Sequence, residues 1–189
     1  MGKRQDGAKK TRESIILAAK ELHEKHGIGA VSVDDIVQYA GVSKGSFYTY
    51  FKRREDVAQE IALREFDTIK RRVHRLRGHA GVKIGKFLVE SACLIEKNGL
   101  ELCKEWMKSA VSPIRQDTPG QRKYRYDRDY ILELLANRQD AGTAQQRERD
   151  ADCIMSQYYG AVALWALTDG AFPMVQTMKD FVQLHLSKT

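Results

Sequence analysis

The chain has 189 residues, of which 42% are hydrophobic and 30% charged, a composition that is typical of a folded globular protein and excludes disorder throughout. The three cysteines, Cys93, Cys103 and Cys153, show no Cys-x-x-Cys spacing, so we expect neither a disulfide framework nor a metal site. No stretch approaches the roughly 18 apolar residues of a membrane span and no apolar segment follows the N-terminal charges, so we expect a cytoplasmic chain that is neither exported nor membrane-bound.

Positive charge is concentrated in the first part of the chain. The formal net charge is +7; residues 1–54 hold 11 Lys and Arg against 6 Asp and Glu, whereas residues 55–189 hold 21 against 19. Such an excess is expected of a protein that binds a polyanion, either a nucleic acid or an anionic surface. The motifs in residues 1–54 decide between the two.

The N-terminal residues predict a basic arm followed by a helix. Residues 1–10 have four basic side chains and no apolar periodicity, so we expect them to be mobile without DNA; the alternative is a basic arm that reaches into a minor groove. A helix is predicted from about Thr11, with Ile15 or Ile16 and then Ala19 and Leu22 facing inward, and with its end at Gly27.

Residues 32–51 predict two short helices that meet at a glycine. Ser32 is placed to cap the first helix, Asp35 can reach back to the cap, and Gly41 ends it. Ser43 is placed to cap the second helix, in which only Phe47 and the following Phe51 have core spacing. The remaining side chains point outward and suit phosphates and base edges; they are Lys44, Gly45, Ser46, Tyr48, Thr49 and Tyr50.

Two helices joined by a tight turn, the second with an outward polar face, form a helix-turn-helix, whose second helix enters the DNA major groove. Residues 11–57 resemble the DNA-binding domain of the tetracycline-repressor (TetR) family of transcriptional regulators. The resemblance is carried by Thr11-Arg12-Glu13, Ile16, Ala18, Ala19, Leu22, Gly27, Ser32-Val33, Ile36, Ala40 to Tyr48, Tyr50-Phe51 and Glu55. Three positions differ: His23 stands where the family usually has Phe, Val37 where it has Ala, and Arg54 where it has Lys.

The resemblance implies a three-helix DNA-binding domain over residues 1–54 and particular DNA contacts. Lys44, Tyr48, Tyr50 and Lys52 would contact phosphates, and Ser46 and Thr49 are better candidates for base edges. The complete set of expected DNA-binding residues is Thr11, Ser32, Val33, Ser43, Lys44, Gly45, Ser46, Tyr48, Thr49, Tyr50 and Lys52.

The rest of the chain, residues 55–189, has helical spacing throughout, so the expected fold is all-α with a second, helical domain. We predict helices over about 55–77, 84–95, 100–111, 126–141, 146–167 and 173–186, and a loop over 113–123, which carries two prolines. The basic run from Lys70 to Arg77 is interpreted as solvated cations at a helix C-terminus, with a second nucleic-acid patch as the alternative.

The predicted helix 146–167 is apolar nearly all round from Ile154 onward, so it must be covered on two sides. Its small residues permit close approach of a partner helix, and with the last helix it would form a two-fold four-helix bundle, as in the family. The expected dimer residues are Gly160, Ala161, Leu164, Met178, Phe181 and Val182. The alternative is a central helix in a monomeric core.

The second domain also carries a set of aromatic, Met and Cys residues that could line an apolar ligand pocket. They are Cys103, Trp106, Met107, Met155, Tyr158, Tyr159 and Trp165. The alternatives are a simple core, or a thiol sensor that uses Cys103 or Cys93.

We find no catalytic or cofactor motif. His23-Glu24-Lys25-His26 has the wrong spacing for a metalloprotease and is interpreted as surface. The sequence therefore predicts a homodimeric transcriptional regulator that is not an enzyme, binds double-stranded operator DNA and is released by a small apolar or aromatic effector. The alternatives are a ligandless dimer whose second domain only dimerises or docks a protein, and a cysteine-based redox regulator.

Overall fold

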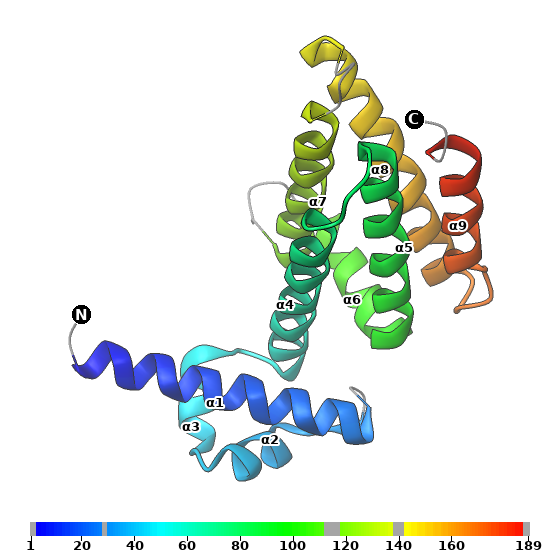
Figure 1. Cartoon of the computed structure of the whole chain (residues 1–189). Coiled ribbons are helices and arrows are strands. Elements are labelled where there is room, and N and C mark those ends of the chain that lie inside the picture. The colour runs from blue at the N-terminus through cyan, green and yellow to red at the C-terminus, as the bar shows by residue number, and fades with distance from the viewer. Residues whose placement is uncertain (1–2, 28–29, 112–117, 138–141, 187–189) are drawn as a thin grey trace. The chain divides into compact units, whose positions relative to one another are not determined.

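The computed structural model describes residues 3–27, 30–111, 118–137 and 142–186. Within these ranges the regular structure is entirely α-helical (Figure 1), which confirms the predicted fold class. The helices are α1 (Lys3–His26), α2 (Val33–Ala40), α3 (Lys44–Tyr50), α4 (Arg54–His74), α5 (Ala80–Asn98), α6 (Leu100–Ala110), α7 (Pro119–Ala136), α8 (Ala144–Leu167) and α9 (Met174–His185). In the same ranges, none of these helices is both long and apolar enough to cross a membrane.

The chain forms two compact units, residues 1–64 and 65–189. The boundary between the units falls within α4, later in the chain than the predicted division at residue 54. The predicted division separates the DNA-binding motif from the rest of the chain, whereas the boundary of the compact unit also includes the first turns of α4. Those turns belong to the first unit because Val57 and Ile61 are buried in its core.

Helix α1 begins at Lys3, so the prediction of a mobile arm and of a helix start near Thr11 was wrong. The side chains of residues 5–10 are exposed, so apolar periodicity could not reveal this part of the helix. Lys, Arg, Gln and Ala are good helix formers, and Asp6 in the first turn is favoured by the positive end of the helix dipole. Local propensity therefore extends α1 beyond the segment that packs.

The caps predicted for α2 and α3 are confirmed. The backbone N–H of Asp35 donates to Ser32 Oγ at 3.1 Å, and Asp35 Oδ2 accepts from the backbone N–H of Ser32 at 2.8 Å, which completes a capping box. Gly41 ends α2 with φ 65°, a left-handed conformation that costs glycine little. The Oγ of Ser43 accepts from the backbone N–H of Ser46 at 3.1 Å and starts α3.

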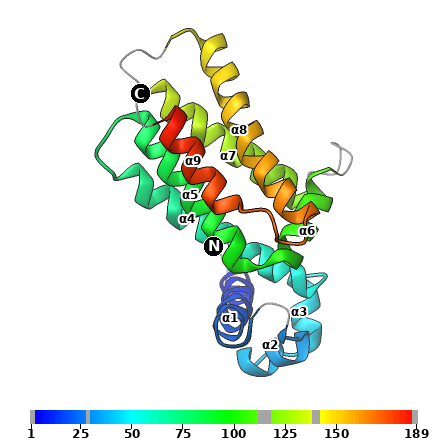
Figure 2. The same cartoon turned by 90° about the vertical axis from the view of Figure 1, so that its right-hand side faces the viewer.

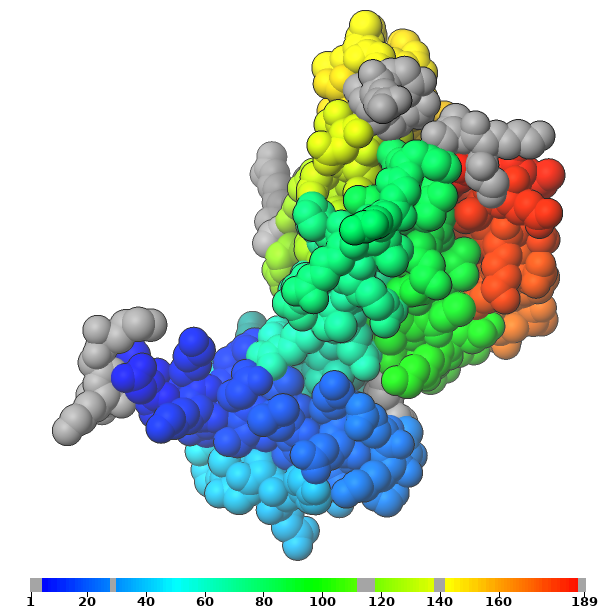
Figure 3. All heavy atoms as spheres, in the orientation of Figure 1, coloured from blue at the N-terminus to red at the C-terminus, as the bar shows by residue number. Residues whose placement is uncertain are grey.

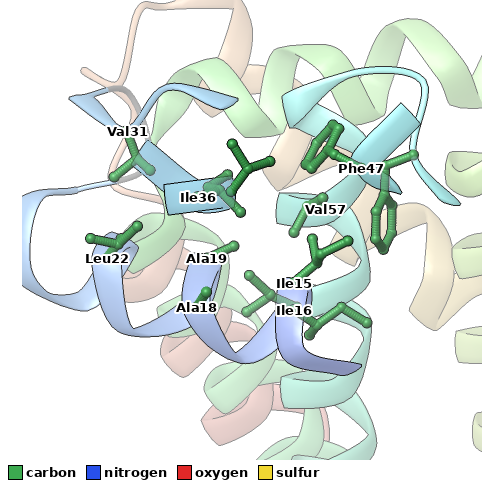
Figure 4. Packing of buried hydrophobic residues seen from close by; sticks show 12 residues of the cluster. Ile15, Ile16, Ala18, Ala19, Leu22, Val31, Ile36, Phe47 and Val57 are labelled. Atoms are coloured by element: carbon green, nitrogen blue, oxygen red, sulfur yellow. The ribbon is translucent and has the colours of Figure 1, made fainter. Parts of the chain in front are cut away.

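The core of the first unit joins its helices through large apolar side chains (Figure 4). Both Ile15 and Ile16 are buried, together with Ile36 of α2 and Val57 of α4. Phe47 of α3 is fully buried, and burial of such a side chain stabilises a fold by about 1.5–3 kcal/mol. This anchor fixes which face of α3 points outward.

In the second unit, α9 packs closely on α5 (Figure 2), and Figure 3 shows the atoms of α9 directly against those of α5 on one face. A methyl group built on Gly85 would lie 2.5 Å from Cγ1 of Val182, so glycine is required for this approach. Helix α7 packs against both α6 and α8. The second unit is thus a bundle whose core receives side chains from α4 through α9.

Helix α7 starts at Pro119, which corrects the predicted loop over 113–123; residues 113–117 of that loop lie outside the described residues. Thr118 Oγ1 accepts from the backbone N–H of Gln121, and the Gln121 side chain accepts from the backbone of Thr118. This capping box with proline at the first helical position favours a helix start. Pro119 therefore marks the start of a helix and not a loop. At the other ends, α4 stops at His74 and α7 at Ala136, each earlier than the predicted ends at residues 77 and 141.

Candidate DNA-binding surface and ligand site

Helix α3 presents its polar side chains outward because two aromatic rings hold it from behind. Phe47 is 0% exposed and Phe51 is 5% exposed, and their ring centroids lie 5.7 Å apart. Tyr48, in contrast, is 52% exposed and packs edge-on against Phe47 at 5.4 Å. The aromatic anchors thus set the rotation of α3 about its axis.

All the expected DNA-binding residues lie in the first unit, and most have exposed side chains. The exposed ones are Ser32, Ser43, Lys44, Gly45, Tyr48, Thr49 and Lys52, and the half-buried ones are Thr11, Val33, Ser46 and Tyr50. A methyl group built on Gly45 meets only Ser43 Oγ, at 3.8 Å, so the backbone there is open to close approach by a ligand. The contact of each residue with DNA stays a prediction.

Several hydroxyls on this surface already make local hydrogen bonds. Ser43 Oγ and Ser46 Oγ lie 2.9 Å apart, and Thr49 Oγ1 donates to the backbone carbonyl of Gly45 at 3.0 Å. The Thr11 hydroxyl likewise donates to the Gly7 carbonyl at 3.1 Å. A hydroxyl retains acceptor capacity when it donates, so these side chains can still accept from a base or, after rotation, donate to one.

Lys44 is held by a partner that DNA would have to displace. Its Nζ lies 2.7 Å from Oδ1 and 3.1 Å from Oδ2 of Asp34, on the exposed first turn of α2. The hydrogen bond and the negative charge of Asp34 raise the pKa of Lys44 above its ordinary value, so the ammonium stays charged. The sequence analysis identified Lys44 but missed Asp34 as its partner.

His23, predicted to lie on the surface, is buried at 9% exposure; Glu24, Lys25 and His26 are exposed as predicted. His23 follows Ile16 and Ala19 on the buried face of α1, which explains why the family position usually holds an apolar ring. Neither ring nitrogen has a hydrogen-bond partner among the residues that the structure describes. Burial, and to a lesser degree the charge of Arg54, lowers the pKa of His23 to about 4.

In the second unit, the structure brings together only part of the predicted ligand set. Cys103, Met155, Tyr158 and Trp165 are buried, and Trp106, Met107 and Tyr159 are half-buried. Cys103 and Tyr158 are close enough to influence each other electrostatically. Trp165 is adjacent to Gly170 in the turn between α8 and α9, since a methyl group built there would lie 3.6 Å from Trp165 Nε1.

A buried ion pair that the sequence analysis missed lies beside Tyr159. Nζ of Lys123 donates to both carboxylate oxygens of Asp127, at 2.5 Å from Oδ1, and the Tyr159 hydroxyl donates to Oδ2 at 3.0 Å. Lys123 is 3% exposed and Asp127 is 0% exposed. Burial raises the pKa of Asp127 and lowers that of Lys123, while each charge opposes the shift of the other.

The ion pair is continuous with the predicted aromatic residues. The Lys123 ammonium lies 3.7 Å from the ring centroid of Phe66, and that ring lies 6.3 Å from Trp106. The helical spacing of Lys123, Asp127 and Tyr130 could have indicated that these residues share one face of α7. Lys123, however, lay in the segment that was predicted to be a loop. We call Phe66, Trp106, Lys123, Asp127, Tyr158 and Tyr159 the core cluster.

Some polar atoms in and around the core cluster have no hydrogen-bond partner within the described part of the chain. They are Trp106 Nε1 and the hydroxyls of Tyr158 and Ser91, and the last two are close enough for Ser91 to act on the pKa of Tyr158. Buried polar groups are usually hydrogen-bonded, and an unsatisfied one costs about 1–3 kcal/mol. The unsatisfied atoms are a tryptophan N–H, which only donates, and hydroxyls, which can donate. Each of these groups could therefore donate a hydrogen bond to an acceptor.

The thiols differ in their environment. Cys93 and Cys153 are exposed, whereas Cys103 is buried and burial raises its pKa to about 11. A protonated, buried thiol is a poor nucleophile. This environment argues against Cys103 as a redox sensor. Within the described ranges no group of three or more His, Cys, Asp and Glu is arranged to hold a metal ion.

A hollow of about 670 Å³ lies elsewhere in the second unit, and no predicted ligand residue lines it. Its described lining comes from α5, α7, α8, α9 and the residue after α9, and consists of Ala80, Gly81, Ile84, Leu135, Asp150, Asp152, Cys153, Ile154, Ser156, Gln157, Phe181, His185 and Leu186.

The predicted dimer residues divide into three groups by exposure. Gly160 and Leu164 are exposed on α8, and a methyl group built on Gly160 meets no atom within 4 Å. Phe181 and Val182 are half-buried on α9. Ala161 and Met178, however, are 4% and 0% exposed, so the core of their own unit already covers them.

Comparison with known proteins agrees with the helix-turn-helix geometry. Residues 15–61 match the family described as "Bacterial regulatory proteins, tetR family". Over 54 residues the chain is 37% identical to the HTH-type transcriptional repressor BepR of Brucella suis, which covers 29% of this chain and 26% of BepR. It is 35% identical over 54 residues to the HTH-type transcriptional regulator AcrR of Shigella flexneri, which covers 29% of this chain and 25% of AcrR. These matches thus span only about a quarter of each relative.

Similarity of fold extends over nearly the whole chain. The structure of Thermus thermophilus FadR, a TetR family transcriptional repressor in complex with lauroyl-CoA, is similar with a TM-score of 0.68, 20% identity and 92% coverage of both chains. That of the transcriptional regulator FadR from Bacillus subtilis, in complex with stearoyl-CoA, has a TM-score of 0.61 and 19% identity, and covers 94% of this chain and 99% of that one. Residues 15–61 thus match the TetR family of regulatory proteins, and the fold of the chain is similar to that of these two regulators.

Proposed function

We propose that this protein is a homodimeric, sequence-specific repressor that binds operator DNA through α3 and releases it when a small effector binds in the second unit. The observation that carries the proposal is the outward face of α3, which Phe47 and Phe51 fix in a domain of the TetR family. The proposed role is regulatory rather than catalytic.

The proposed readout assigns different tasks to different side chains. Lys44, Tyr48, Tyr50 and Lys52 bind phosphates and fix the register of α3 on the duplex, whereas Ser46 and Thr49 contact base edges. Ser32 and Ser43 cap α2 and α3, whose first backbone N–H groups can also meet phosphates. Thr11, Val33 and Gly45 complete the proposed surface.

Dimerisation supplies the second DNA-binding domain. A two-fold dimer reads two half-sites about 34–36 Å apart, one helical turn of DNA. We place the partner against the exposed residues Gly160 and Leu164 of α8, together with Phe181 and Val182 of α9, and we leave out Ala161 and Met178 because they are covered. Leu167, which is 78% exposed, extends this apolar surface by one turn of α8.

The proposed effector has an apolar body and at least one hydrogen-bond acceptor. The core cluster offers aromatic rings for the body and unsatisfied groups at Trp106 and Tyr158 for the acceptor. A cation is disfavoured because the Asp127 carboxylate is already neutralised by Lys123. Acyl-CoA compounds have this chemistry, and the two FadR structures that are similar in fold are described with lauroyl-CoA and stearoyl-CoA.

Selection of binding sites from a random DNA pool tests the DNA-binding part. We expect the wild type to enrich a palindrome. Ser46→Ala and Thr49→Ala should change the enriched sequence, whereas Lys44→Ala should weaken binding to every sequence alike. Lys97→Ala, which removes an exposed lysine of α5, is the charge-matched control. The proposal fails if no sequence is enriched, or if Lys97→Ala weakens binding as much as Lys44→Ala does.

A further inference from the structure

The C-terminal part of α4 carries a basic hollow whose function the proposed repressor mechanism leaves unassigned. The hollow has a volume of about 400 Å³, and its described lining consists of Asp67, Lys70, Arg71, His74 and Arg75. All five residues belong to the second unit. Helix α7 lies next to this part of α4, as its contacts through Tyr126, Tyr130 and Glu133 show.

The carboxylates near the hollow are already engaged. Asp67 Oδ1 accepts a hydrogen bond from the Tyr126 hydroxyl at 2.5 Å. Glu133 of α7 lies 4.0 Å from the Lys70 ammonium and 3.5 Å from Nδ1 of His74. These contacts leave the guanidinium groups of Arg71 and Arg75 without a carboxylate partner among the described residues.

Arg71 lies in the last turn of α4 and Arg75 directly follows the helix, four positions later, so their positive charges repel each other. Arg71 donates to the neutral Thr68 hydroxyl at 3.1 Å, and Arg75 makes no hydrogen bond or ion pair within the described ranges. Two guanidinium groups at this spacing can bind phosphate oxygens in bidentate fashion. An anion in the hollow would turn their repulsion into a favourable interaction.

Lys70 supplies a third, fixed positive charge. Its Nζ lies 4.6 Å from the ring centroid of Tyr126 and 4.7 Å from that of Tyr130. Two aromatic contacts restrict a side chain that otherwise has much rotamer freedom, so less entropy is lost when it binds a ligand. The hollow thus combines one oriented ammonium with two guanidinium groups that lack a counter-ion.

We propose that this hollow binds the phosphate groups of a small molecule. The phosphates belong either to the proposed effector, as in a coenzyme A thioester, or to a separate phosphorylated compound. The second possibility does not depend on the proposed function. In both cases the charges on α4 recognise the phosphates, and the recognition is independent of any acyl group.

Calorimetric titration of the full chain separates these possibilities. The probes are inorganic pyrophosphate, coenzyme A, lauroyl-CoA and lauric acid, which has the acyl chain without phosphates. The test variant is Arg71→Gln with Arg75→Gln. The matched control is Arg72→Gln, which removes a guanidinium of the same helix that pairs with Glu90 and does not line the hollow.

We expect the double variant to bind coenzyme A and pyrophosphate about tenfold or more weakly, since two charge-assisted contacts are lost, while lauric acid binding and the control are unchanged. Arg71→Lys with Arg75→Lys, which keeps the charge, should restore part of the affinity and also shows that loss is not due to misfolding. If lauroyl-CoA and coenzyme A lose affinity equally in the double variant, the phosphates belong to the effector. If only the unacylated probes lose affinity, the phosphates belong to a separate compound.

Absence of wild-type binding to every phosphate probe, or equal affinity in wild type and double variant, overturns the proposal. It is also overturned if the double variant only flattens the salt dependence of operator binding, because the arginines would then contact DNA. Operator release is measured separately, so a wild type that binds phosphate probes but never releases DNA refutes the effector proposal and not this one.

Discussion

The ammonium of Lys44 lies 2.7 Å from the carboxylate of Asp34, so the first residue of α3 is paired with the first turn of α2. Both side chains are more than half exposed, at 54% and 72%, so the pair itself contributes little to stability. Its importance is for binding, because Asp34 places a negative charge where we propose that DNA phosphates arrive.

Replacement of either partner should therefore change DNA binding in opposite directions. Lys44→Ala should weaken operator binding and reduce the slope of log affinity against log salt by about one unit. Asp34→Asn should tighten binding, since it frees Lys44 and removes a repulsive charge. Titrations of labelled operator at several salt concentrations measure both. An unchanged slope in Lys44→Ala would exclude Lys44 from the interface.

His23 should make the first unit sensitive to acid. Its pKa is about 4 in the folded chain and 6.5 in the unfolded chain, so between these values the unfolded state binds a proton that the folded state does not. The free energy of unfolding should therefore fall as the pH drops from 6.5 towards 4, with a slope of at most about 1.4 kcal/mol per pH unit from this group.

His23→Phe should remove that part of the pH dependence, and it should also stabilise the protein at pH 7 by about 1 kcal/mol because an unsatisfied polar ring is replaced by an apolar one. Urea unfolding at pH 5 and pH 7 compares the two chains. The difference in the free energy of unfolding between pH 5 and pH 7 should be smaller in the variant. If it is the same, the ring of His23 is not buried as a neutral group.

The buried pair Lys123 and Asp127 should behave as a unit. Lys123→Met alone leaves a buried carboxylate without its cation and should destabilise the second unit by about 3–5 kcal/mol. The double variant Lys123→Met with Asp127→Leu should recover most of that loss. Denaturant unfolding of the two single variants and the double variant gives the coupling energy. If the stability losses of the two single variants simply add up in the double variant, the two side chains do not form an ion pair.

The sequence was most informative where structure depends on nearby residues. Ser32, Asp35, Gly41 and Ser43 determine the ends of α2 and α3 through local hydrogen bonds and backbone conformation, and the family pattern adds the orientation of α3. Burial that depends on distant parts of the chain could not be predicted in this way. Asp127, for example, is buried with Tyr159, which lies on another helix.

Three misses have simple causes. The start of α1 was missed because its first residues bury nothing, and the start of α7 was missed because Pro119 was taken as a loop signal although Thr118 and Gln121 form a capping box. His23 was assigned to the surface from its polarity alone. Its spacing after Ala19 on the apolar face of α1 was the better indicator.

Gly160→Trp tests the proposed dimer surface. A Cβ atom added at Gly160 meets nothing within 4 Å among the described residues, so we expect an indole there to leave the monomer folded but to clash with a partner helix. We expect sedimentation to show monomers and operator affinity to fall. Arg149→Trp, on the polar part of α8, is the control and should remain dimeric. An intact Gly160→Trp dimer would place the interface elsewhere.

Operator binding and effector binding should be coupled, and tryptophan fluorescence measures this coupling. Trp106 and Trp165 both lie in the second unit, so their emission reports on that unit alone. Titration of lauroyl-CoA or another acceptor-bearing apolar compound, with and without operator, should give a weaker effector affinity in the presence of DNA. The factor should equal the loss of DNA affinity caused by the effector, typically about five- to 150-fold. If every compound that binds tightly does so equally well with and without operator, the ligand-released repressor is contradicted and the ligandless dimer takes its place.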